Sequence, residues 1–175
     1  MALIARSANN VSFSVYKWAK SVVYTVGTTT TTLSGHHAGL TILGAYPGDL
    51  TAIKTPTLAV LGYDDDVAGQ DMLGSAEAIS EDLYAIAFYG FVVLGASQSD
   101  QAHLRYRDRL RNDLVQVLRR VGGEAGIPLY DSLSKAEYGV VEVINVRSRL
   151  IPVSAPDVMA DRYKFVVTGE VPYVD

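Results

Sequence analysis

The sequence predicts an α+β fold in which a mostly antiparallel sheet packs against one long amphipathic helix. Two observations predict the sheet: residues 83–94 form an apolar run without a charge, and residues 162–173 alternate between apolar and polar side chains. One observation predicts the helix, because apolar side chains recur at three- and four-residue steps between residues 97 and 121. Strands before and after a helix in this order are typical of an α+β domain.

Composition limits the classes of protein to which the chain belongs. Its 175 residues suffice for one domain with a buried core, and 49% hydrophobic against 19% charged residues is typical of a folded protein. The net charge of −4 disfavours general binding to nucleic-acid backbones. With no cysteine, no signal-peptide pattern and no apolar run of membrane-spanning length, the sequence favours an intracellular or virion location and predicts no membrane contact.

The chain divides into an N-terminal segment with an extended loop or arm, residues 1–56, and a core domain, residues 57–175. The apolar period of residues 11–26 fits both a helix and a strand, and we favour a helix over residues 12–24 that Gly27 ends. Five consecutive threonines follow and predict an extended or loop-like chain. Glycine and proline are frequent in residues 28–56, which predicts a loop or hairpin that reaches off the body.

The core domain is expected to begin with a short strand at residues 57–61. The apolar run at residues 83–94 has two apolar faces, which indicates a strand covered on both sides. We expect the long helix to cover one face and a loop or a neighbouring subunit to cover the other. Further extended segments are expected at residues 127–131, 138–146 and 162–173.

The predicted helix carries six of the ten arginines of the chain. Ser97 and Asp100 resemble a capping box at its start, and Gly122-Gly123 would end it. The arginines form either a solvated outer face or an interface with acidic groups of a partner, and the sequence leaves both open. Acidic interruptions make direct DNA binding the third choice.

The three histidines and the acidic clusters of the chain are predicted to be solvated. His36 and His37 are adjacent, point apart and have no third ligand at a recognised spacing, so we expect a polar loop tip and no metal site. Asp64–Asp66 predict a solvated turn, with Ca²⁺ or Mg²⁺ binding as the alternative. His103 is expected on the polar side of the helix, and a solvated acidic cluster is expected at Glu77, Glu81 and Asp82.

Motifs of the common catalytic sites do not occur in this sequence. It contains no GxSxG, GxxxxGK[ST], GxGxxG or HExxH pattern. We therefore expect no catalytic, cofactor-binding or metal-binding residues, no cofactor, and a protein that is not an enzyme.

The order of elements resembles the tail terminator proteins of long-tailed bacteriophages and the related neck and tail-completion proteins. The resemblance is one of pattern and element order, and it covers about the last 120 residues. The segments that carry it are LYAIAFYGFVVLG (83–95), SQSDQAHLRYRDRLRNDLVQVLRRVGG (97–123), IPLYDS (127–132) and DRYKFVVTGEVPY (161–173).

This resemblance implies a virion structural protein, assembled in the host cytoplasm. It would form a homohexameric ring that caps the tail tube and joins it to a neck or connector protein, with DNA passing through the lumen without specific binding. Exposed sheet edges and a charged helix suit such repeated contacts. We expect the subunit and ring contacts to involve Arg105, Arg109 and Arg119 of the helix and His36, His37 and Tyr46 of the extended loop.

Three other functions stay open from the sequence. The first is another neck or head-completion connector protein. A second, from a different class, is a small-ligand-binding or enzymatic α+β domain, whose pocket would lie between sheet and helix and be lined by Phe88 and Tyr89. The third is a regulator that binds nucleic acid with steep salt dependence.

Overall fold

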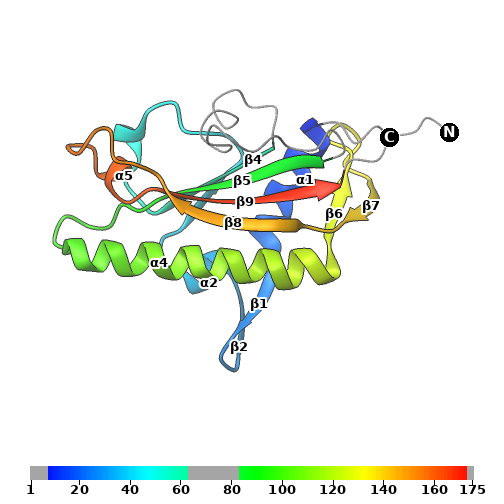
Figure 1. Ribbon diagram of the computed structural model, residues 1–175, viewed down its shortest axis with the longest axis horizontal. Coiled ribbons are helices and arrows are strands. Elements are labelled where there is room, and N and C mark those ends of the chain that lie inside the picture. The colour runs from blue at the N-terminus through cyan, green and yellow to red at the C-terminus, as the bar shows by residue number, and fades with distance from the viewer. Residues whose placement is uncertain (1–7, 63–82, 173–175) are drawn as a thin grey trace.

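A five-stranded, mostly antiparallel sheet forms the centre of the computed structural model, which describes residues 8–62 and 83–172 (Figure 1). The strand order is β3-β4-β5-β9-β8. β3 (Thr41–Leu43) runs parallel to β4 (Thr57–Gly62), and the other neighbouring strands are antiparallel. The α+β class and the mostly antiparallel sheet are thus confirmed. The predicted acidic clusters at residues 64–66 and 77–82 lie outside the described residues.

The apolar run predicted as a strand is β5 (Leu83–Phe91), which lies between β4 and β9 (Phe165–Pro172). Because successive side chains of a strand point to opposite faces, β5 contributes to two separate cores. Ile86 and Phe88 belong to the larger core, and Tyr89 belongs to the smaller one. Both faces of this strand are therefore buried, as the sequence predicted.

Two helices cover the larger face of the sheet, where the sequence predicted one. α1 (Ala8–Ser21) packs against β4, and α4 (Asp100–Val117) packs against β9 and β8 (Ile144–Leu150). Both helices bury side chains in the same core: Val11, Val15 and Trp18 from α1, and Leu110, Leu114 and Val117 from α4.

The smaller face is covered by the chain's own loops. Of the two covers expected for it, a loop or a neighbouring subunit, the structure shows the loop. The three-residue 3₁₀ helix η1 (Leu50–Ala52) and the short helix α5 (Met159–Arg162) lie over this face. Tyr46 packs its ring edge-on against Tyr89, with 5.1 Å between the ring centroids. No neighbouring subunit is needed to bury these strands.

Both ends of the long helix differ from the prediction. Its N-cap is Ser99, whose hydroxyl accepts a hydrogen bond from the Ala102 amide at 3.1 Å, and the expected capping box at Ser97 is wrong. The backbone continues past Gly122-Gly123 as the π-helical segment η3 (Leu118–Ala125). Its end is Gly126, which adopts a φ of 81° that favours glycine.

His103 is buried, so the expectation of a solvated histidine is wrong. Its Nε2 accepts a hydrogen bond from the Leu94 amide at 3.1 Å, and its Nδ1 donates to the Ser99 carbonyl at 2.9 Å. The imidazole also stacks on the ring of Tyr163, with 4.9 Å between centroids. This histidine thereby joins the start of α4 to the segment after β5 and to the segment before β9.

A small two-stranded sheet lies beyond η3, formed by β6 (Ile127–Tyr130) and β7 (Glu137–Val141). The single strand predicted at residues 138–146 is therefore two strands, β7 and the first part of β8. Helix α1 holds β6 in place, because the Ser14 hydroxyl accepts a hydrogen bond from the Tyr130 amide at 2.7 Å.

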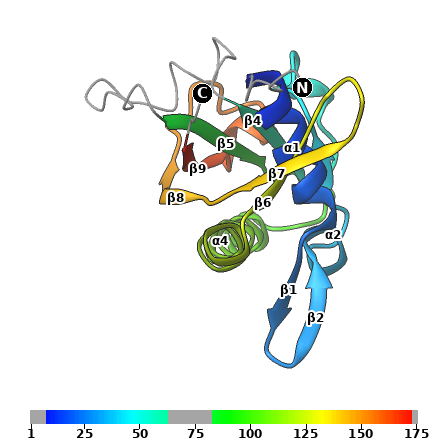
Figure 2. The ribbon, with the colours of Figure 1, turned by 90° about the vertical axis from the view of Figure 1, so that its right-hand side faces the viewer.

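A second small sheet is the hairpin of β1 (Val23–Val26) and β2 (Thr29–Thr32), which stands off the body below α4 (Figures 1 and 2). Helix α1 ends at Ser21, and Gly27 instead forms the hairpin turn with a φ of 61°. The prediction for the threonine run is confirmed: Thr28 lies in the turn, and Thr29–Thr32 form β2. The rest of the predicted loop returns to the body, where β3 pairs with β4.

Candidate functional site

The candidate site lies where the β1–β2 hairpin meets helix α4. A single helical turn, α2 (Leu33–His36), follows the hairpin. The Thr32 hydroxyl accepts a hydrogen bond from the Gly35 amide at 3.1 Å and caps this turn, while Leu33 is fully buried in the larger core. These two contacts fix the histidines that follow beside α4.

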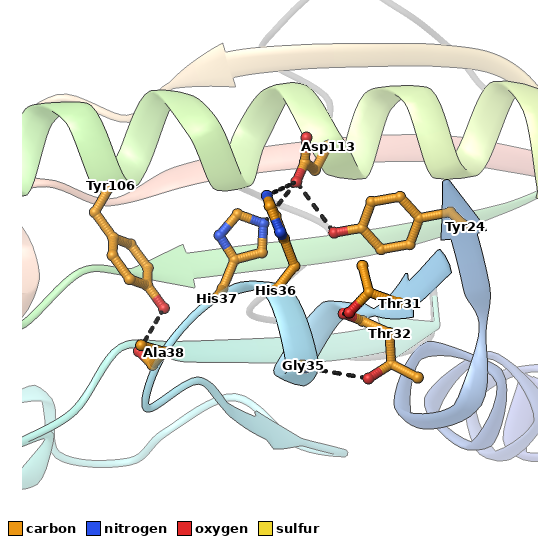
Figure 3. A network of polar contacts seen from close by, with 9 residues as sticks. All are labelled: Tyr24, Thr31, Thr32, Gly35, His36, His37, Ala38, Tyr106 and Asp113. Atoms are coloured by element: carbon orange, nitrogen blue, oxygen red, sulfur yellow. Dashed lines mark hydrogen bonds and ion pairs between the residues drawn. The ribbon is translucent and has the colours of Figure 1, made fainter. Parts of the chain in front are cut away.

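Asp113 of α4 brings this junction together (Figure 3). Its Oδ2 lies 2.8 Å from His37 Nε2 and 3.6 Å from His36 Nε2. The Tyr24 hydroxyl of β1 donates a hydrogen bond to the same oxygen at 3.1 Å. One carboxylate oxygen therefore connects β1, α2 and α4. We call His36, His37 and Asp113 the His–Asp cluster.

The His–Asp cluster is partly shielded from water. Side-chain exposure is 2% for His37, 20% for Asp113 and 28% for His36. Burial by itself raises the pKa of Asp113, but hydrogen bonds from His37 and Tyr24 and the charges of both histidines outweigh it, so the pKa is lowered. At neutral pH this side chain is therefore a carboxylate that accepts hydrogen bonds.

Two tyrosines border the His–Asp cluster. Burial and the nearby Asp113 charge raise the pKa of Tyr24, which keeps its hydroxyl protonated and able to donate. Tyr106 packs edge-on against His37, with 5.7 Å between ring centroids, and donates a hydrogen bond to the Ala38 carbonyl at 3.0 Å. Burial raises the pKa of Tyr106 to about 12, so this phenol also stays neutral.

A groove of about 520 Å³ runs along the same junction. One wall is β1 with the hairpin turn, residues 23–27, and the other is formed by α4 and η3. Asp113 belongs to this second wall, so the His–Asp cluster and the groove share a residue. The other residues of that wall are Gln116, Val117, Arg120 and Val121.

The structure places the predicted site residues in three different surroundings. Arg105, Arg109 and Arg119 are exposed on the outer side of α4 and η3. Tyr46 covers the smaller face of the sheet. The two histidines meet at α4, so the expectation of a solvated loop tip is wrong for His37, and the expectation that their side chains diverge is wrong for both.

Sequence reasoning missed Asp113 and Tyr24, the partners of the histidines. A signal for Asp113 exists in the spacing of the helix: it follows Leu110 by three residues and precedes Val117 by four. A carboxylate at the spacing of a buried stripe needs a polar partner. Nothing in the sequence names that partner, because it lies 76 residues away.

Comparison with known protein families, with curated proteins and with solved structures finds no match to this chain.

The chemistry of the His–Asp cluster allows two roles. Two imidazoles and one carboxylate can hold a divalent metal ion, or they can form a charge-assisted hydrogen-bond network. Among the described helices, none is both long and apolar enough to cross a membrane.

Proposed function

We propose that this chain is a virion structural protein that forms a ring at the head–tail junction of a long-tailed bacteriophage. In this proposal the ring caps the tail tube and joins it to the connector, and DNA passes through its lumen. The observation that carries the proposal is the β1–β2 hairpin, which stands off the body (Figure 2). The order of strands and helix that resembles tail terminator proteins adds to it.

The hairpin has the properties of a subunit contact. An isolated two-stranded hairpin is marginally stable in water, and its outer edges carry backbone groups that can pair with another chain. Residues 27–30 are exposed, and the apolar Val23 is also exposed at its base. Packing on a second copy of the chain would cover both the backbone edges and this apolar side chain.

Strand β8 supplies a second surface that differs from the hairpin. It is an edge strand of the main sheet, and its Ile144 and Leu150 are 37% and 47% exposed. A contact between two different surfaces of identical chains is head-to-tail, and such contacts close into a ring when the rotation between copies permits. A hairpin that reaches a neighbouring copy therefore supports a ring more strongly than a twofold dimer.

Helix α4 is the amphipathic helix in this proposal. Its inner side lies on the sheet, and its arginine-bearing outer side faces away from the larger core. Arg105 and Arg109 lie one turn apart and are both exposed. They can pair with acidic groups on a neighbouring subunit, on the tail tube protein or on the connector.

Oligomeric state is the direct test. We expect the purified wild-type chain to form rings, measured by light scattering and electron microscopy. In the test variant an Asn-Gly turn replaces residues 25–30 and joins Tyr24 to Thr31, which are cross-strand partners in the hairpin. This change removes the hairpin tip and keeps Tyr24 beside Asp113, so we expect a folded chain that no longer forms rings.

A charge reversal tests the arginines separately. Arg105→Glu combined with Arg109→Glu should weaken rings or their binding to purified tail tubes. Lys54→Glu is the matched control, because Lys54 is exposed beside the smaller face of the sheet. A wild-type chain that stays monomeric at high concentration and does not bind tail tubes would contradict the proposal. Rings that bind the connector but not tail tubes would instead favour a head-completion protein.

A further inference from the structure

We propose that His36, His37 and Asp113 form a binding site for a divalent transition-metal ion, with Zn²⁺ as the fitting ion. One nitrogen or oxygen from each of the three side chains lies within 4.8 Å of the others. His36 ends α2, His37 directly follows it and Asp113 belongs to α4, so the donors fill three positions of a four-coordinate site. The proposal is independent of the ring, because metal binding is measured on the chain itself.

The two distances to Asp113 fit tetrahedral coordination after small side-chain movements, and the two histidine nitrogens, which lie within 4.8 Å of each other, must move closer together. Tetrahedral zinc with bonds of about 2.0–2.1 Å places its ligand atoms about 3.3 Å apart. Asp113 Oδ2 lies 3.6 Å from His36 Nε2 and 2.8 Å from His37 Nε2. The first distance must shorten slightly and the second must lengthen by about half an ångström. The two imidazole planes, 82° apart with centroids separated by 4.9 Å, approach the carboxylate from different directions.

The donor set selects the class of metal. Imidazole nitrogens suit zinc and its neighbours, whereas Ca²⁺ and Mg²⁺ prefer shells of oxygen. Two histidines and one carboxylate leave a fourth position for water, as in zinc sites with three protein ligands.

Tyr24 is the expected positioning residue of this site. Its hydroxyl donates a hydrogen bond to Asp113 Oδ2 at 3.1 Å from outside the ligand set. Such outer contacts orient ligating carboxylates and affect metal affinity. A metal ion here would join α2 to α4, and through Tyr24 it would also hold β1. The ion would therefore fix the base of the β1–β2 hairpin.

The test is titration of the chain with ZnCl₂ by calorimetry, after removal of any polyhistidine tag. Co²⁺ titration adds a spectroscopic readout, because tetrahedral Co²⁺ absorbs strongly in the visible range. We expect one ion per chain. His36→Gln is the main variant, since His36 is 28% exposed and the fold does not depend on burying it. Asp113→Asn is the second ligand variant, and Tyr24→Phe tests positioning alone.

Asp108→Asn is the matched control, because Asp108 is a carboxylate of the same helix that lies 47% exposed and pairs with Arg107 at 3.0 Å. Circular dichroism checks that each variant is folded. We expect His36→Gln and Asp113→Asn to weaken Zn²⁺ binding at least about tenfold, and Tyr24→Phe to weaken it by less. Asp108→Asn should bind as the wild type does.

Two results would overturn the metal site. One is a wild-type chain that binds no Zn²⁺ in the micromolar range. The other is a folded His36→Gln variant that retains wild-type affinity and the same Co²⁺ spectrum. The two proposals fail independently. A wild-type chain that forms rings but binds no Zn²⁺ would contradict only the metal site, and a chain that binds Zn²⁺ but forms no rings would contradict only the proposed function.

Discussion

His37 Nε2 lies 2.8 Å from Asp113 Oδ2, and this contact ties the segment after the β1–β2 hairpin to helix α4. His37 is almost fully buried, so its ring depends on this carboxylate. We predict that Asp113→Ala lowers the free energy of unfolding by about 1–3 kcal/mol, because a buried imidazole loses a charged partner. Urea unfolding measures the loss.

Hydrogen exchange shows where the loss acts. In Asp113→Ala, the amides of residues 23–37 should exchange faster than in the wild type. The amides of β5 should keep the same order of protection among themselves as in the wild type. Asp108→Ala removes an exposed carboxylate from the same helix and serves as the control. Equal protection of the hairpin in both variants would show that Asp113 does not hold it.

Gly90 of β5 and Phe165 of β9 are cross-strand partners. Their close packing predicts that a methyl group added at Gly90 strongly lowers the stability of the fold. A Cβ on Gly90 would lie 2.1 Å from the Phe165 ring, which is fully buried. We predict that Gly90→Ala destabilises the fold by about 3 kcal/mol, because a fully buried ring would have to shift within the core. Gly95→Ala is the control, since a Cβ there meets no atom within 4 Å. A Gly90→Ala melting temperature equal to that of the control would contradict this packing.

Ser14 gives a prediction about the contact between α1 and β6. Its buried hydroxyl accepts from the Tyr130 amide at 2.7 Å and donates to the Asn10 carbonyl at 2.6 Å. Ser14→Ala should cost about 1–2 kcal/mol of unfolding free energy, because the Tyr130 amide loses its partner. Ser21→Ala on the exposed end of the same helix should cost less than about 0.5 kcal/mol. Similar losses in chemical denaturation of both variants would rule out this role for Ser14.

Asp161 predicts how stability changes with pH. Burial alone raises the pKa of this carboxyl, but hydrogen bonds from the Ala155 amide, Lys164 and the Ser154 amide outweigh it, so the pKa is lowered. A lowered folded-state pKa adds stability above the unfolded-state value of about 4, and this stability is lost as the pH falls through the folded-state value.

We therefore predict that Asp161→Asn lowers the unfolding free energy by about 2 kcal/mol at pH 7, and that the difference from wild type shrinks below about pH 4. Thermal unfolding across this range measures the change. Asp157→Asn, at an exposed position of the same loop, is the control. A difference that stays constant down to pH 2 would show that the Asp161 charge is not the cause.

Local patterns sufficed to predict the elements whose burial follows from their own sequence. The two-faced apolar run predicted β5, the helical stripe predicted α4, and the alternation near the C-terminus predicted β9. These predictions succeeded because backbone geometry sets the period of buried side chains within one element. Helix ends were less well predicted, since the choice between Ser97 and Ser99 as N-cap depends on the path of the preceding loop.

Only the tertiary structure decided which distant elements meet. It placed β3 in the main sheet, gave α1 a share of the face assigned to α4, and brought two histidines to a carboxylate more than 70 positions away along the chain. A local pattern indicates that a side chain is polar, but it does not indicate which distant residue that side chain contacts in the folded protein. The sequence thus determined an α+β body with a charged helix, whereas packing of that helix against the hairpin created the His–Asp cluster.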